Sequence, residues 1–461
     1  MRLSPTFATR RLLALLLLAL SPLALAQSGA AGPKAPAPAS AVFPRAQFSS
    51  PEITYSVLLI HPTPPKDDRE ASARKLLASK YKELNTPQTP GKLSPEAVVE
   101  ALPPQEMEPL DEQLLNVMGR GLDAAERQRL LGARHATLLA FRLPFAQRHE
   151  VLLAATRFAH QLAVEQGALL WDAETREYFS AKSWKESRLD GWSRGVPNVP
   201  AQITLHVYRD GEALRVISLG MAKFGLPDLV MEQVPHSLAD DMAWVVNGVA
   251  QLMGEGLMPS TDGVLEVDFT KVKDAKVKSR LEARTEKGAK RKAQLRALAA
   301  RRDEGDPDNA LLELAFPGSG PLEARRTQVL DALFGPRKDP TTSVPAGDPE
   351  LEAVARKARA RLEQLKPRVV KGMQFPEQLL IKAGFRTDDG GKEFMWLEVT
   401  SWEKGRWRGT LANEPQSVKA LRLGSSVDVA EAEVDDYLYV SPTGAREGGE
   451  SSQILMRREG Y

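Results

Sequence analysis

The sequence of 461 residues contains no cysteine. This absence excludes disulfide bonds, thiol nucleophiles, thiolate metal sites and a lipid-modified cysteine. Oxidising compartments penalise stray thiols, so a cysteine-free chain is typical of a periplasmic or secreted protein. Beyond its first 26 residues, the chain also has no apolar run of the roughly 20 residues that a membrane-spanning helix needs. We therefore expect no transmembrane span after processing.

Motifs of the common catalytic sites are missing as well. The chain has no G-x-S-x-G nucleophile elbow, no glycine-rich phosphate loop and no HExxH pair. Its six histidines are scattered, and His149 and His160, which share a helical stretch, are about 16 Å apart along it. Acidic pairs at 240–241, 388–389 and 435–436 suit a helix start, a turn and a strand end. The sequence therefore predicts no catalytic residue, no metal site and no cofactor.

The first residues have the order of an export signal. A positive start is followed by an apolar run at 12–20 and by the small residues Ala24 and Ala26 at the cleavage positions. We expect Sec export with cleavage after Ala26. The twin-arginine route is the alternative, because Arg10 and Arg11 are adjacent, but their neighbours fit that route poorly. The mature protein is thus predicted to be periplasmic or secreted, and the sequence does not distinguish the two.

Composition divides the chain into a signal peptide at 1–26 and four further parts. Residues 27–50 are rich in alanine and proline and are predicted to be a disordered leader. Residues 51–270 alternate strand and helix patterns, which predicts one layered α+β domain. Residues 271–347 are interpreted as a basic helical linker and loop, with one short helix at 322–334. Residues 348–461 predict a helix followed by a β-rich domain.

Local patterns give the first domain its expected elements. Buried strands are predicted at 53–61 and 137–143, and a helix at 147–166 is followed at once by another strand, which is a βαβ-type unit. Residues 86–109 are broken by prolines and are expected to be loop. Asp210-Gly211, between two β-rich runs, predicts a hairpin.

The basic stretch at 271–302 allows two interpretations. It carries thirteen Lys or Arg and three Asp or Glu, a local charge of +10. One interpretation is a basic helix that weakly contacts an anionic surface. The other, which we favour, is a solvated connector, because Leu281, Leu295 and Leu298 are too few for an apolar stripe. The net charge of the whole chain is only +2, so no nucleic-acid partner is expected.

The C-terminal pattern predicts a small antiparallel β-barrel-like domain with a preceding helix. Asp348 and Pro349 start that helix, Pro367 is expected to end it, and short strands with glycine-containing turns follow from Gln378. Alternation along the strand at 392–403 predicts that Trp396 is in the core. Trp407, between two arginines, is also predicted to point inward.

Trp402, beside a turn, is predicted to be the exposed aromatic of this domain. An exposed tryptophan suits small-molecule and sugar sites. The candidate binding residues are Trp402, Arg406, Arg408, Asn413, Glu414 and Asp436.

The same region carries an ordered set of short motifs. They are Met395-Trp396, Gly409-Thr410-Leu411, Asn413-Glu414-Pro415, Gly424 and Asp436-Tyr437-Leu438-Tyr439. Together they resemble the YegJ-like family of bacterial domains of unknown function, over about 110 residues, with Tyr437 where the family has tryptophan. The resemblance implies no activity and transfers no functional residue. In the first domain, "LLWDAETREYF" and "GMAKFGLPDLVMEQV" are reminiscent of another uncharacterised bacterial α+β domain.

Two functions remain open at this point. The first is a non-enzymatic envelope protein that binds a partner protein or a ligand. The second is a periplasmic hydrolase that uses carboxylates not clustered in the sequence. A pocket with two facing carboxylates, or with a histidine against a serine or aspartate, would favour the hydrolase. The missing motifs favour binding.

Export predicts a mature protein that begins at Gln27. N-terminal sequencing of the protein recovered from the periplasm or the medium measures this directly. Recovery from the cytosol with Met1 in place would contradict the prediction.

Overall fold

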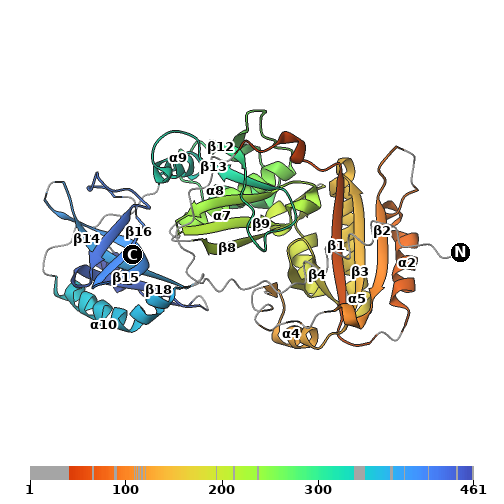
Figure 1. Cartoon of the computed structure of the whole chain (residues 1–461), viewed down its shortest axis with the longest axis horizontal. Helices are drawn as coiled ribbons and strands as arrows, with labels where there is room; N and C mark the ends of the chain where they lie inside the picture. The colour runs from red at the N-terminus through yellow and green to blue at the C-terminus, as the bar shows by residue number, and fades with distance from the viewer. Residues whose placement is uncertain are drawn as a thin grey trace.

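The computed structural model describes residues 41–458 without 65–66, 88–90, 108–109, 111, 113–114, 116–117, 120, 194, 211–212, 236–237, 337–347, 374–376, 389, 414 and 443–444. Within these residues the strands form three main sheets and one two-stranded hairpin, β6 (Trp192–Ser193) with β7 (Val196–Pro197). The predicted α+β class is confirmed. Figure 1 shows the three sheets following one another along the molecule in chain order. No helix of the described part is long and apolar enough to cross a membrane.

The N-terminal sheet has five strands in the order β2-β3-β1-β4-β5. Its strands are β1 (Glu52–His61), β2 (Glu96–Leu102), β3 (His135–Pro144), β4 (Leu169–Asp172) and β5 (Glu177–Phe179), and its helices are α2 (Arg69–Lys80), α4 (Ala124–Leu131), α5 (Arg148–Gln166) and α6 (Ala181–Trp184). β1 pairs antiparallel with both β3 and β4, so the predicted βαβ unit has β1 inserted between its strands. β2 lies in a segment predicted to be loop, and it forms an edge of the sheet.

The middle sheet has six strands in the order β11-β12-β13-β10-β9-β8. Its strands are β8 (Thr204–Asp210), β9 (Ala213–Leu219), β10 (Asp228–Val234), β11 (Val264–Asp268), β12 (Lys292–Ala299) and β13 (Leu311–Ala315), and its helices are α7 (Ala239–Gly254), α8 (Ala275–Ala283) and α9 (Leu322–Phe334). The hairpin predicted at Asp210 is present as β8 and β9.

The basic segment predicted to be a separator is part of this middle sheet, so that prediction is wrong. Leu281 of α8 and Leu295 of β12 are 2% and 0% exposed. The few apolar residues of the segment are divided between a helix and a strand. A search for one helical stripe therefore misses them, because each element buries its own residues at its own period.

One hydrophobic core joins the N-terminal and middle sheets. It takes in Phe158 of α5, Val246 of α7 and Phe224 of the short 3₁₀ helix η7 (Met221–Phe224), all fully buried. The predicted leader at 27–50 contributes to the same core, because Phe43 and Phe48 are 4% and 1% exposed. The prediction of a disordered leader is therefore wrong for these residues. Residues 27–40 of the predicted leader, and the predicted signal peptide before them, are outside the described residues.

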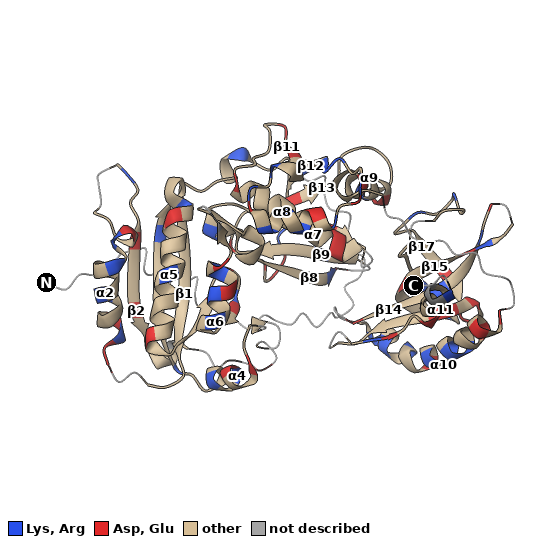
Figure 2. Ribbon diagram, turned by 180° about the vertical axis from the view of Figure 1, so that it is seen from behind, with Lys and Arg blue, Asp and Glu red and all other residues tan. Residues whose placement is uncertain are grey.

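The C-terminal sheet has six antiparallel strands in the order β17-β16-β15-β14-β18-β19. Its strands are β14 (Gln378–Arg386), β15 (Lys392–Glu403), β16 (Arg406–Leu411), β17 (Ser426–Ala430), β18 (Val434–Val440) and β19 (Arg446–Gly448), and its helices are α10 (Pro349–Lys371) and α11 (Glu450–Arg458). α10 covers one face of the sheet with Ala358, Leu362 and Leu365. Figure 2 shows basic and acidic residues together along α10, and Arg361 pairs with Glu447 at 2.8 Å.

α10 does not end at Pro367, as predicted, but continues to Lys371. Proline inside a helix removes one backbone hydrogen bond and usually breaks the helix. Here the proline lies in the last two turns, between Leu365 and Val369, which are 2% and 7% exposed against the sheet. Burial of these two side chains offsets the missing bond.

A β-bulge in β15 changes the face on which the tryptophans lie. The pairing of β15 with β16 shifts register between Val399 and Ser401. A bulge inserts one unpaired residue, so side chains beyond it exchange faces. Trp402 therefore joins the face covered by α10, where its ring centroid is 6.4 Å from that of Trp407. Trp396 remains on the opposite face and is only half-buried.

Two of the three tryptophan predictions are thus wrong. Trp396 is not in the core, and Trp402 is not the exposed aromatic. Trp407 is in the core as predicted and is 1% exposed. The described aromatic with the largest exposure in this sheet is Phe394, at 43%.

Trp407→Ala is expected to destabilise the C-terminal sheet by about 3–5 kcal/mol, the usual cost of deleting a buried tryptophan. Trp396→Ala is the matched control and should cost clearly less, because the Trp396 side chain is only partly buried. Hydrogen exchange of the β15 and β16 amides in the full chain measures both. Equal losses in the two variants would contradict the assignment of faces.

Candidate binding site

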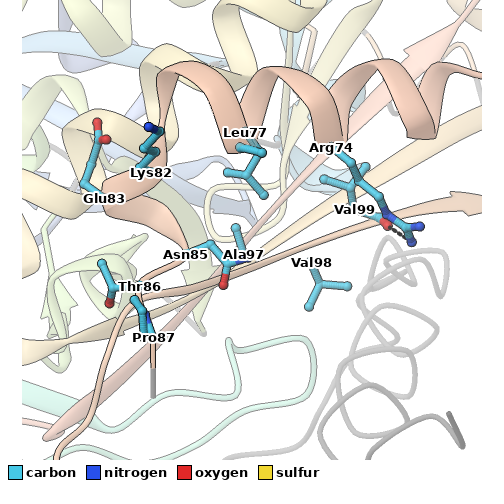
Figure 3. A pocket seen from close by; sticks show the side chains of 11 residues that line it. Arg74, Leu77, Lys82, Glu83, Asn85, Thr86, Pro87, Ala97, Val98 and Val99 are labelled. Carbon is cyan, nitrogen blue, oxygen red and sulfur yellow. Dashed lines mark hydrogen bonds between the residues drawn. The ribbon is translucent and has the colours of Figure 1, made fainter. Parts of the chain in front are cut away.

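A groove lies between α2, the short 3₁₀ helix η2 (Lys82–Leu84) and β2. Its volume is about 780 Å³, within the range of about 300–1,000 Å³ that ligand pockets usually have. Figure 3 shows Leu77 of α2 and Ala97 of β2 at its two walls. The N-cap of α2 is Asp68, whose carboxylate accepts from the backbone N–H of Ala71 at 2.8 Å. This cap fixes where the helix starts beside the edge of the sheet.

Contacts between α2 and β2 show which backbone groups of β2 point out of the sheet. Nη2 of Arg74 donates to the carbonyl oxygen of Val99 at 3.3 Å, as the dashed line in Figure 3 marks. The backbone N–H of Ala101 donates to Oε2 of Glu70 at 3.0 Å. In an antiparallel ladder the outward residues alternate with those bonded to the neighbouring strand. Ala97, two residues before Val99, therefore directs its N–H and C=O outward.

The edge of β2 is covered on both sides of Ala97 but not at Ala97 itself. The backbone N–H of Thr86 donates to the carbonyl oxygen of Pro95 at 3.2 Å, and Arg74 covers Val99. Among the described residues, none hydrogen-bonds to the outward groups of Ala97. These two groups open into the groove, which is lined in part by Ala97.

The groove has few ionisable residues. Those in its lining are Arg74, Lys82 and Glu83, and all three are exposed. Arg74 forms an ion pair with Glu70 of the same helix. The lining contains no pair of carboxylates and no histidine.

A second group of ionisable residues is buried where the N-terminal and middle sheets meet. Asp172 at the end of β4 is fully buried, and its Oδ2 accepts from Nζ of Lys223 at 2.7 Å and from Nε of Arg188 at 3.2 Å. Arg188 also donates to Glu177 Oε2 at 2.9 Å and to Thr175 Oγ1 at 3.0 Å. Asp172 comes from one sheet and Lys223 from η7, which leads into the other.

Burial and charge oppose each other in this cluster. Burial alone would raise the pKa of Asp172, but Lys223 and Arg188 outweigh it and hold that pKa below its usual value. Burial lowers the pKa of Lys223. Burial and the neighbouring carboxylate of Asp172 raise the pKa of Glu174 to about 8. Burial also raises the pKa of Asp228 to about 6, although Asn309, Met221 and Ser218 donate hydrogen bonds to it.

Sequence reasoning missed this cluster. Its signal was present, because Lys223 is the one charged residue in the otherwise apolar run from Met221 to Leu226. A lone lysine among apolar residues needs a buried carboxylate partner, and Asp172 at the end of an apolar strand is such a partner.

Three of the candidate binding residues lie near one another on β15 and β16 but point to two faces. Trp402 faces α10, with Nζ of Lys366 4.8 Å from its ring centroid, and its Nε1 donates to Glu431. Arg406 and Arg408 are exposed on the other face and converge on Asp428 of β17. The tryptophan and the arginines therefore do not form one surface.

The other candidates hold local structure. Oδ1 of Asn413 accepts from the backbone N–H of Trp396 at 2.6 Å. Asp436 is 1% exposed and accepts from the backbone N–H groups of Tyr437 and Ser451, each at 2.8 Å. Glu414 lies outside the described residues.

The residues that the structure describes contain no group of three or more His, Asp or Glu placed to hold a metal ion. His61 is buried with its Nε2 3.0 Å from the hydroxyl of Thr137, and burial lowers its pKa to about 3. Burial likewise lowers the pKa of His149 to about 4. Both histidines are packed as neutral side chains.

The C-terminal sheet matches a known family of domains. Residues 348–458 match the family described as "Uncharacterized protein conserved in bacteria (DUF2314)". These residues, from α10 to α11, are about a quarter of the chain, and they are a bacterial domain of uncharacterised function. Neither a curated protein nor a solved structure matches the chain.

Glu174→Gln tests the raised pKa through the pH dependence of stability. A carboxyl with a folded pKa of about 8 keeps a proton that the unfolded chain releases near the usual glutamate pKa of 4.5. The stabilisation is complete below that lower value and is lost as pH rises toward 8, by up to about 1.4 kcal/mol per pH unit. The variant should therefore gain stability relative to the unaltered protein as pH rises through this window, measured by urea unfolding.

The Glu174→Gln variant and the unaltered protein contain the same histidines. The effect of the histidines on stability therefore cancels in the difference between the two proteins. The lowered pKa values of His61 and His149 make the folded protein less stable as pH falls, whatever occupies position 174. Glu304→Gln, in an exposed loop of the middle sheet, is the matched control and should show no such trend. A pH-independent difference for Glu174→Gln would contradict the raised pKa.

Proposed function

We propose that this protein is an exported bacterial envelope protein that binds a partner and does not catalyse a reaction. The observation that carries the proposal is the chemistry of the groove between α2 and β2. It has the volume of a ligand site, yet its lining has no facing carboxylates and no histidine. Such a site offers shape, apolar contact and backbone hydrogen bonds, which suit recognition.

Export is supported by the order of charge, apolar run and small residues at the start of the chain, and by the absence of cysteine. We place the mature protein in the periplasm or the medium. Within the bacterial domain at residues 348–458, the motif order from Met395 to Tyr439 supports the finer assignment to the YegJ-like family. Contact of residues 271–302 with an anionic surface is the least supported part, because Arg284 and Lys292 are ion-paired within the fold.

A periplasmic hydrolase is the second candidate, and the buried cluster is the one observation that favours it. A protonated Glu174 near an ionised Asp172 is the arrangement of a general acid beside a second carboxylate. Asp172, Lys223 and Asp228 are, however, each 0% exposed. Their position suits a structural ion cluster better than a site that a substrate must enter.

Capture of the protein from its native envelope tests the proposal. The full chain with a C-terminal affinity tag is crosslinked in living cells and isolated from the envelope fraction. We expect one partner to be recovered in a constant ratio to the tagged chain. The Glu174→Gln variant should recover the same partner, because Glu174 is not in the groove. An unrelated exported protein with the same tag is the control.

Either of two results would overturn the binding proposal. One is recovery of nothing beyond what the control protein recovers. The other is hydrolytic activity of the purified chain that disappears in Glu174→Gln while the variant keeps its fold.

A further inference from the structure

The uncovered position of β2 has the hydrogen-bonding pattern of an antiparallel strand that lacks a partner. Ala97 offers one N–H donor and one C=O acceptor on the same side. In an antiparallel pair, two residues directly opposite each other exchange both such bonds. Addition of an extended segment to an open sheet edge is a common way of binding peptides.

We propose that the groove binds an extended peptide segment of the partner, with one residue opposite Ala97. This inference rests on the proposed binding function and names the chemistry of the ligand. The peptide residue donates its N–H to the carbonyl oxygen of Ala97 and accepts from the N–H of Ala97. The flanking coverage by Thr86 and Arg74 limits the bonded part to about one residue, because successive outward positions are about 7 Å apart along the strand.

The walls of the groove select the side chain next to that residue. Leu77 and Ala78 of α2 and Lys82 of η2 line the groove together with Ala97. Leu77 is 6% exposed and Ala78 is exposed at the rim. An aliphatic side chain of the peptide fills this space and excludes water from the two backbone bonds, which strengthens them. We expect the ligand to have an extended backbone and an aliphatic residue.

Other occupants fit the site less well. A compact polar metabolite does not match a donor and an acceptor from the same backbone residue together with an apolar wall. A helix has no free backbone groups in its middle to offer to Ala97. The mixed charge of Arg74, Lys82 and Glu83 gives the groove no strong preference for an anion or a cation.

A displayed library of random heptapeptides, panned against the full chain, provides the probe. The selected peptides are then measured by fluorescence anisotropy against the unaltered protein and two variants. Ala78→Trp fills the groove from an exposed position and should weaken binding at least tenfold. Ser79→Trp places the same side chain at the next exposed position, outside the lining, and should leave binding unchanged.

The backbone bonds are tested separately on the peptide. N-methylation at each position in turn removes one N–H, and methylation at a single central position should weaken binding at least tenfold. Selection of no peptide, equal binding by Ala78→Trp, or tolerance of every N-methylated analogue would overturn the inference. A partner captured from the envelope equally well by the Ala78→Trp variant would also overturn it, while leaving the binding function intact.

Discussion

The Lys223–Asp172 ion pair is the interaction on which the joint packing of the first two sheets depends. It connects a side chain from the end of β4 with one from η7, and both are fully buried at an Nζ–Oδ2 distance of 2.7 Å. Removing one member of a buried pair leaves an uncompensated charge and typically costs about 3–5 kcal/mol. Because Arg188 shares the same carboxylate, the pair also fixes the π-helical turn after α6 (Lys185–Leu189). The common core of the two sheets is therefore built around a charge that must remain matched.

The sequence predicts a helix or strand well where the apolar residues of that element follow a single period along its whole length. The expected strand at 53–61 is β1, and the expected helix at 322–334 is α9. The pattern fails where apolar residues are shared between short elements, as in α8 and β12, or where a bulge breaks the period of two, as before Trp402. A bulge depends on how two strands pair, which alternation along one strand does not contain.

The groove could not be predicted for a related reason. β2 lies between prolines in a segment that predicts loop, and it becomes a strand because Val98 and its neighbours pair with β3. The exposed edge then depends on sheet order, which places β2 outermost. The candidate residues of the C-terminal domain were chosen by residue type, but Asn413 and Asp436 bind backbone N–H groups. Polar residues that hold turns and helix starts have the same composition as those of binding sites.

The edge of β2 differs from an edge that is merely exposed. Proteins usually protect edge strands with charged side chains or covering segments, and here Glu70, Arg74 and Thr86 do so at three of four outward positions. At the fourth, Ala97 is 8% exposed and stands beside the apolar side chain of Leu77. Backbone groups in such surroundings are costly to leave without a partner. Among the described residues, the outward positions on both sides of Ala97 each have one bonded backbone group, whereas Ala97 has none. A bound segment relieves this constraint.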